Sequence, residues 1–210
     1  MVICEIKKRK IIPFISILFL LIILSGCVNI KCAYIPDEII NNGWYENLSL
    51  RNTGLHFLGL EKWCTSLYEI RGKYPASLSI STLKSLLLTN EDELFNKIQG
   101  IIEDNLSDNI KLNHSSRFSG ERYLSNSHQS KYIIYNGIDL TKELNVRIIG
   151  EVWNCGISGL SVICIGIAYI TNKDNFSVEY TKNWQSIVSD PNGEIENYFG
   201  EGLIYNINCH

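Results

Sequence analysis

The sequence lacks an excess of basic residues, since its 210 residues include 19 lysines and arginines against 22 aspartates and glutamates. Nucleic-acid binding needs a clustered basic surface that neutralises phosphates, so the composition argues against a nucleic-acid partner. The sequence also lacks an apolar run of the roughly 18–20 residues that span a bilayer. The apolar run at residues 11–24 has 14 residues and contains Pro13. A transmembrane anchor is therefore the weaker interpretation of that run.

Motifs typical of enzymes and zinc sites are missing as well. No C-x-x-C pair occurs, the cysteine spacings fit no zinc motif, and the four histidines show neither H-E-x-x-H spacing nor triad partners. Ser81-Thr82-Leu83-Lys84 and Ser107-Asp108-Asn109 match two elements of the serine β-lactamase pattern, but the third, K-T-G, is absent, so we interpret both as coincidence. We expect no catalytic residue, no cofactor and no metal site.

What the sequence does contain is a three-part N-terminus. A basic cluster at residues 7–10 is followed by the apolar run and then by small residues, which is the layout of a secretory signal peptide. The four residues Leu24-Ser25-Gly26-Cys27 resemble the lipobox of prokaryotic lipoproteins. The resemblance implies that residues 1–26 are removed and that Cys27 carries a lipid. That lipid would attach the protein to the cell membrane on its extracytoplasmic face.

Removal of residues 1–26 leaves 184 residues, of which 15 are basic and 21 acidic, for a net charge of −6. This length fits one domain with a sizeable core. The charge supplies no polybasic segment that would help the lipid to hold the membrane. We expect residues 27–54 to form a lipidated N-terminus and tether, and residues 55–210 to form a single extracytoplasmic domain.

The first part of that domain shows helical periodicity. Phe57, Leu60, Cys64 and Leu67 recur at helical spacing, which predicts an amphipathic helix over residues 55–71. Further helices are expected at residues 79–88 and 89–104, and a long surface loop at residues 105–130. The β-rich runs that follow are residues 132–135, 146–157, 162–171 and 203–208. The predicted fold class is therefore α+β, with N-terminal amphipathic helices packed on a C-terminal antiparallel sheet.

One local resemblance bears on this fold. The segment from Leu67 to Pro75, with Gly72-Lys73-Tyr74-Pro75 at its end, resembles the helix-end pattern of type IV pilins and pseudopilins. The resemblance implies a helix that leads into an antiparallel sheet, and so a pilin-like layout. In this sequence, however, a lipobox stands where the family has its prepilin peptidase site. We take the layout from the resemblance and no pilus function.

Five cysteines remain after Cys4 and Cys27 are set aside, and two bridges with one free thiol are the simplest accounting in an oxidising compartment. Gly159 and Leu160 predict a two-residue type II′ turn, which opposes residues whose numbers sum to 319. Cys155 then lies opposite Cys164, and we predict a disulfide between them. Two buried free thiols are the alternative. The pairing of Cys32, Cys64 and Cys209 stays open.

The function that these observations favour is a lipid-anchored lipoprotein that binds a ligand or partner through residues 105–130. A pilin-like structural subunit and an envelope hydrolase are the alternatives. Residues 190–196 alternate oxygen ligands as calcium loops do, but Asp190-Pro191-Asn192-Gly193 is a strong turn sequence, and we expect a plain turn. Four sequons leave glycosylation open, at Asn47, Asn105, Asn113 and Asn175.

Overall fold

The computed structural model describes residues 30–210 except 41, 57–60, 86–88, 106–108 and 171–177. Eight strands form one sheet in the order β1-β3-β4-β8-β7-β6-β5, with β2 also paired to β3, and every neighbouring pair is antiparallel. The strands are β1 (Tyr45–Glu46), β2 (Asn52–His56), β3 (Glu61–Ile70), β4 (Ala76–Ser85), β5 (Ile110–Tyr123), β6 (Gln129–Asp139), β7 (Leu144–Cys155) and β8 (Leu160–Ile170).

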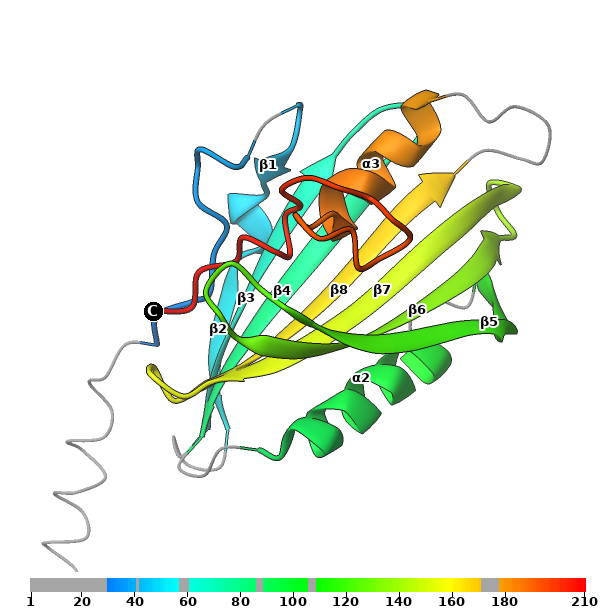
Figure 1. Cartoon of the computed structure of the whole chain (residues 1–210). Coiled ribbons are helices and arrows are strands. Elements are labelled where there is room, and N and C mark those ends of the chain that lie inside the picture. The colour runs from blue at the N-terminus through cyan, green and yellow to red at the C-terminus, as the bar shows by residue number, and fades with distance from the viewer. Residues whose placement is uncertain (1–29, 41, 57–60, 86–88, 106–108, 171–177) are drawn as a thin grey trace, which may run out of the picture.

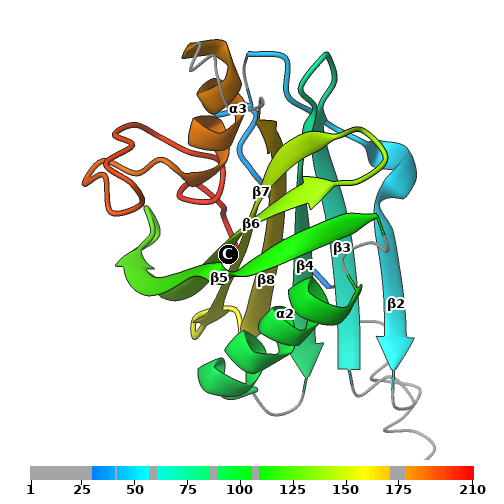
Figure 2. The same cartoon turned by 90° about the vertical axis from the view of Figure 1, so that its right-hand side faces the viewer.

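Helices cover both faces of this sheet (Figures 1 and 2). Helix α2 (Glu91–Asn105) lies on one face, and α3 (Val178–Val188) lies on the other with the C-terminal segment, residues 189–210. A short 3-10 helix, η1 (Leu48–Leu50), precedes β2. The core is accordingly split into two clusters, one under α2 and one under α3. In strands β7 and β8, consecutive residues, which point to opposite faces of the sheet, are buried, as predicted for central strands covered on both sides.

Two strand glycines let the helices approach the sheet closely. A Cβ atom on Gly150 would lie 2.7 Å from Ile102 Cδ1 of α2, and one on Gly166 would lie 2.9 Å from Ile187 Cγ2 of α3. Both separations are shorter than carbon atoms tolerate. These glycines therefore make room for the two helices, one on each face.

The predicted fold class is wrong, because the chain is dominated by an eight-stranded antiparallel sheet and its N-terminal half is not helical. Where it is described, the segment predicted as a helix over residues 55–71 belongs to β2 and β3, and in β3 Cys64, Ser66 and Tyr68 alternate as buried positions. Residues 57–60, with Phe57 and Leu60, lie outside the described residues. The predicted helix at residues 79–88 is largely β4, whose buried Leu78, Ile80 and Thr82 also alternate. Buried Ser66 and Thr82 hid this alternation because they are polar. Only the helix predicted at residues 89–104 is confirmed, as α2.

Other segments also differ from the predictions. The expected loop at residues 105–130 contains β5, an edge strand with polar residues on both faces and hence no apolar period. The expected tether, residues 27–54, packs on the sheet as far as it is described, with Ala33, Ile35 and Trp44 buried. The expected strand at residues 203–208 consists of turns with one bridge, between Tyr34 and Asn208. Helix α3 was not anticipated.

The register of the β7–β8 hairpin corrects the predicted disulfide. Opposed residues have numbers that sum to 315, so Cys155 lies opposite Leu160, Cys164 lies opposite Glu151, and both thiols are free. The loop holds four residues, 156–159, and Gly159 adopts its positive φ of 65° at the end of that loop. The predicted and observed registers put the same side chains on the same faces. Hydrophobic patterning therefore could not distinguish them.

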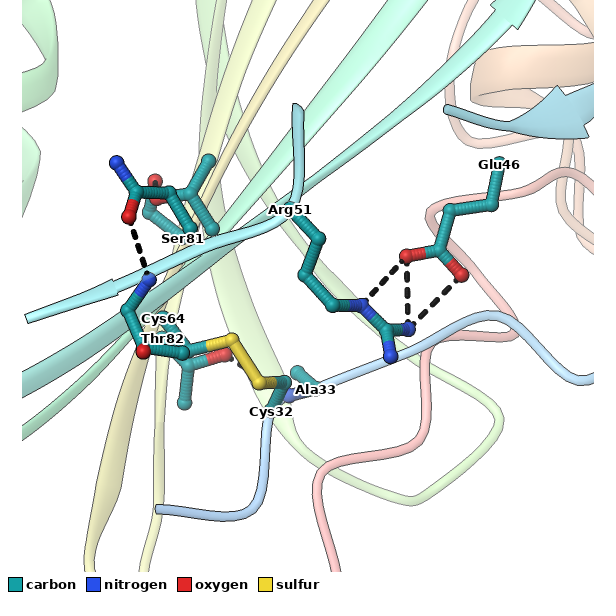
Figure 3. Close-up of a disulfide and its surroundings, with 10 residues drawn as sticks. Cys32, Ala33, Glu46, Arg51, Cys64, Ser81 and Thr82 are labelled. Carbon is teal, nitrogen blue, oxygen red and sulfur yellow. Dashed lines mark hydrogen bonds and ion pairs between the residues drawn. A yellow bond between two sulfur atoms is a disulfide. The ribbon is translucent and has the colours of Figure 1, made fainter. Parts of the chain in front are cut away.

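One disulfide is present, between Cys32 and Cys64, and it fastens the start of the described chain to β3 (Figure 3). The loop that it closes spans 32 residues. With Cys155, Cys164 and Cys209 free, the described part of the chain has one bridge rather than the expected two. The pilin-like layout also fails, because Leu67 to Ile70 end strand β3 and the next residues turn into β4.

A buried ion-pair network ties the C-terminal segment to the sheet. The Arg122 guanidinium donates to both carboxylate oxygens of Glu151 at 2.8 and 2.7 Å, and its Nη1 lies 3.3 Å from Asp190 Oδ2. All three side chains are at most 2% exposed. Asp190 also begins the predicted turn, which is confirmed: its Oδ1 accepts the Asn192 N–H at 2.9 Å, and Gly193 has a φ of 66°.

Candidate metal centre

Four side chains that can ligate metals converge at one end of the sheet. They are His128, Cys155, Cys209 and His210, and one ligand atom from each lies within 4.8 Å of the others. Both cysteines are buried, His128 is half-buried and His210 is exposed. The cluster is therefore enclosed by protein on the side of the two sulfur atoms and reaches the surface at His210.

The strand topology brings these residues together from three separate segments. His128 lies in the turn between β5 and β6, which is closed by a hydrogen bond from Leu124 N–H to the His128 carbonyl at 2.9 Å. Cys155 is the last residue of β7. Cys209 and His210 follow the backbone bridge between Asn208 and Tyr34. No local sequence spacing connects these segments.

Hydrogen bonds from Asn126 fix the β5–β6 turn against the C-terminal segment. Its side-chain amide donates to the Ile207 carbonyl at 3.0 Å and lies 3.8 Å from Cys209 Sγ. Its side-chain oxygen accepts the His128 N–H at 3.1 Å. Asn126 thus orients a histidine and a cysteine of the cluster at once.

The separations between His210 and the two sulfur atoms are close to those around a tetrahedral ion. Nδ1 of His210 lies 3.7 Å from Cys155 Sγ and 3.8 Å from Cys209 Sγ. Zinc bound to sulfur near 2.3 Å and to nitrogen near 2.0–2.1 Å places such ligands about 3.5 Å apart. At His210, movements of a few tenths of an ångström would bring Nδ1 to that separation from both sulfur atoms, whereas the full set, which spans up to 4.8 Å, must contract further around an ion.

The electrostatics of the two thiols are asymmetric. Burial raises the pKa of Cys155, but the polar groups of Ser158, with the Cys209 thiol and His210, outweigh that burial and lower the pKa to about 6. Burial and the hydrogen bond to Cys155 raise the pKa of Cys209 to about 12. Cys155 is therefore the more readily deprotonated of the two thiols. A metal ion that binds both sulfur atoms as thiolates would displace the proton that Cys209 holds.

Unpaired polar atoms gather around the same two sulfur atoms. Five buried side-chain nitrogen or oxygen atoms in the described residues lack a hydrogen-bond partner, and three of them belong to His128, Trp153 and Ser158. Trp153 Nε1 and the polar groups of Ser158 lie close enough to lower the pKa of Cys209 and Cys155, respectively. Buried groups are normally paired, and clustered exceptions point to an ion or water that completes them. Thiolate ligands would accept from the two donors, and an ion would engage His128 Nε2.

The residues expected to matter from the sequence are placed elsewhere. Cys27 lies outside the described residues, and Cys164 is fully buried next to Glu151, which together with burial raises its pKa. Ser81 lies within β4 and shares a hydrogen bond of 3.0 Å with Thr65. The expectation of no metal ligands rested on local spacing and did not anticipate this cluster. The adjacent pair Cys209-His210 was the only signal in the sequence.

Comparison with known proteins adds no relative, since no family model, curated protein or solved structure matches this chain. Over the described ranges between residues 30 and 210, no helix is long and apolar enough to cross a membrane. The fold and the cluster define an eight-stranded antiparallel sheet, covered by one helix on each face, with a two-cysteine, two-histidine centre at one end.

Proposed function

We propose that this protein is a membrane-anchored, extracytoplasmic lipoprotein that binds one divalent thiophilic metal ion through His128, Cys155, Cys209 and His210. The observation that carries the metal site is the convergence of these four ligand atoms within 4.8 Å. Zinc is the best match, because two thiolates and two imidazoles in a tetrahedral arrangement are a typical structural zinc set. Four protein ligands leave no open position for substrate.

Charge also favours a divalent ion. Two thiolates neutralise the two positive charges of Zn²⁺, whereas Cu⁺ would leave the cluster with one uncompensated negative charge. Both sulfur atoms belong to buried cysteines, where an uncompensated charge is costly. The binding site should therefore prefer Zn²⁺ over Cu⁺ more strongly than thiolate chemistry alone would predict.

The anchoring part of the proposal is supported by the N-terminal sequence. A basic cluster, a short apolar run and Leu24-Ser25-Gly26-Cys27 occur in the order that lipoprotein signal peptides show. Cys27→Ala should abolish labelling by fatty acid and release the chain from membranes or leave it as an uncleaved precursor. Continued cleavage after Gly26 with continued fatty-acid labelling of the Cys27→Ala chain would refute the lipid assignment.

The metal site is tested by freeing the full chain of metal, with its Cys32–Cys64 disulfide intact, and titrating it with Co²⁺ and then with Zn²⁺. We expect one ion per chain and the visible and near-ultraviolet absorption of tetrahedral, thiolate-bound Co²⁺, which Zn²⁺ displaces. Changes next to a ligand already weaken metal binding about 10–100-fold, so Cys209→Ser or His128→Ala should weaken it by more than 100-fold.

Cys164→Ala is the matched control, because Cys164 is a buried free thiol outside the cluster. This variant should bind one ion as tightly as the natural chain. Metal binding that survives Cys209→Ser unchanged would refute the site. A native chain that carries a Cys155–Cys209 disulfide and no metal would refute it equally.

A further inference from the structure

The sheet register shows at which end of the molecule the anchoring segment departs. Cys32 is bonded to Cys64, which lies opposite Thr82 in β4, and Thr82 lies opposite Val162 in β8. Val162 in turn pairs with Trp153, two residues before the end of β7. Cys32 is therefore attached near the end of the sheet at which β7 turns into β8.

The chain then runs from Cys32 away from that end. Ala33 N–H donates to Thr82 Oγ1 at 2.9 Å, and Ile35 N–H donates to the Tyr68 hydroxyl at 3.1 Å (Figure 3 shows the first of these residues beside the disulfide). Tyr68 lies four residues beyond Cys64, toward the opposite end of β3. The start of the described chain and the C-terminus accordingly lie near the β7–β8 hairpin (Figure 1).

Chain length limits where a lipid on Cys27 can reach. Cys27 precedes Cys32 by five residues, and an extended chain spans at most about 3.6 Å per residue, which gives about 18 Å. Nine residues separate Trp153 from Leu144 along β7, or about 30 Å at 3.3 Å per residue. The lipid can therefore reach a bilayer at the β7–β8 end of the sheet but not one at the opposite end.

That end presents an exposed apolar side chain at its tip. Ile157 is 78% exposed in the hairpin loop between Gly156 and Ser158, which is more than any other exposed large apolar residue in the described chain. An isolated apolar tip on a short loop is suited to the interface of a bilayer, where a side chain can enter the headgroup region.

We infer that the β7–β8 hairpin rests on the bilayer, with Ile157 among the lipid headgroups and the Cys–His cluster at the membrane-proximal end of the molecule. This inference rests on the lipid anchor proposed above. It places the metal centre beside the membrane surface, because Cys155 is the residue at which β7 enters the hairpin. The β6–β7 turn, with Leu140, then points away from the membrane.

The test uses the full lipidated chain in phosphatidylcholine and phosphatidylglycerol vesicles that contain brominated lipid. A fluorescent noncanonical amino acid replaces Ile157 in one protein and Leu140 in another. Leu140 is the matched control, since it is also apolar, 57% exposed and located in a turn, but at the other end of β7. We expect the brominated lipid to quench most of the fluorescence at position 157 and none at position 140.

Flotation of the vesicles separates the two proposals. If the chain does not float with the vesicles, the lipid anchor fails and the inference fails with it. If the chain floats but position 157 stays as bright as position 140, the anchor stands and the orientation is overturned. Adding the Cys27→Ala change should remove the quenching at position 157, because a single apolar tip is too weak to hold the protein on the membrane.

Discussion

At the scale of single residues, Trp153 connects the metal proposal to a measurable effect. Its Nε1 is buried without a hydrogen-bond partner and lies beside Cys209. Trp184 is also fully buried, but its Nε1 donates to Glu196 at 3.1 Å. Replacing either ring by phenylalanine removes the same volume. The two variants therefore differ in which interaction is lost.

We predict that Trp153→Phe lowers zinc affinity about 10–100-fold, as the loss of a donor to a ligand does. Trp184→Phe should leave zinc affinity unchanged but cost more stability in the metal-free protein, because it also breaks a hydrogen bond worth about 1 kcal/mol. Competition against a zinc chelator and urea unfolding measure the two effects. Equal zinc affinities would show that Trp153 does not support the ion.

The Arg122 network leads to a second prediction at this scale. Arg122→Met would leave the buried carboxylates of Glu151 and Asp190 without their counter-charge. Removing one partner of a buried ion pair costs about 3–5 kcal/mol, and we expect a loss of that size at pH 7. Urea unfolding of the variant and of Glu38→Gln, an exposed control, measures it.

At the scale of elements, Gly202 controls how the C-terminal segment docks on α3. A Cβ atom at this position would lie 2.5 Å from the Ser189 carbonyl oxygen and 2.8 Å from the Ser189 nitrogen, both of which are backbone atoms. The glycine also donates its own N–H to that carbonyl at 3.0 Å. Seven residues before Cys209, the C-terminal segment thus passes the end of α3 through a contact that only glycine permits.

Gly202→Ala should therefore cost about 1–3 kcal/mol, as overpacking does, and weaken zinc binding by displacing the C-terminal segment. Gly100→Ala is the control: nothing lies within 4 Å of its Cβ position in α2. That change should stabilise the protein by about 0.5–1 kcal/mol, because alanine is the better helix former. Thermal unfolding and zinc titration of both variants check these expectations.

Elements also show how far the sequence could predict this fold. Helix α2 and the central strands β7 and β8 were predictable, because long apolar patterns with a cap or with both faces buried are unambiguous. Strand β5 was not, since an edge strand with two polar faces has no apolar period. The metal cluster could not be predicted for a different reason: its ligands are brought together only in the fold, by the end of β7, the β5–β6 turn and the C-terminal segment. Their sequence positions carry no regular spacing.

At the scale of the whole molecule, the Cys32–Cys64 disulfide adds a covalent link to the contacts by which Ala33, Ile35 and Trp44 hold the N-terminal segment on the sheet. Closing a loop of 32 residues stabilises by about 3–4 kcal/mol in the chain-entropy description. We predict that Cys32→Ala combined with Cys64→Ala loses about that amount in urea unfolding. Reducing the natural chain should lose a similar amount, whereas reductant should leave the double variant unchanged.

The same disulfide also determines how the molecule bears mechanical load. Under the proposed anchoring, tension from the lipid enters the fold at Cys32 and crosses the sulfur–sulfur bond directly into β3, which is hydrogen-bonded on both sides. The residues between the two cysteines, including β1, η1 and β2, lie outside this path. A force that pulls the protein from the membrane would therefore shear β3 against β4 before it could peel away the N-terminal segment.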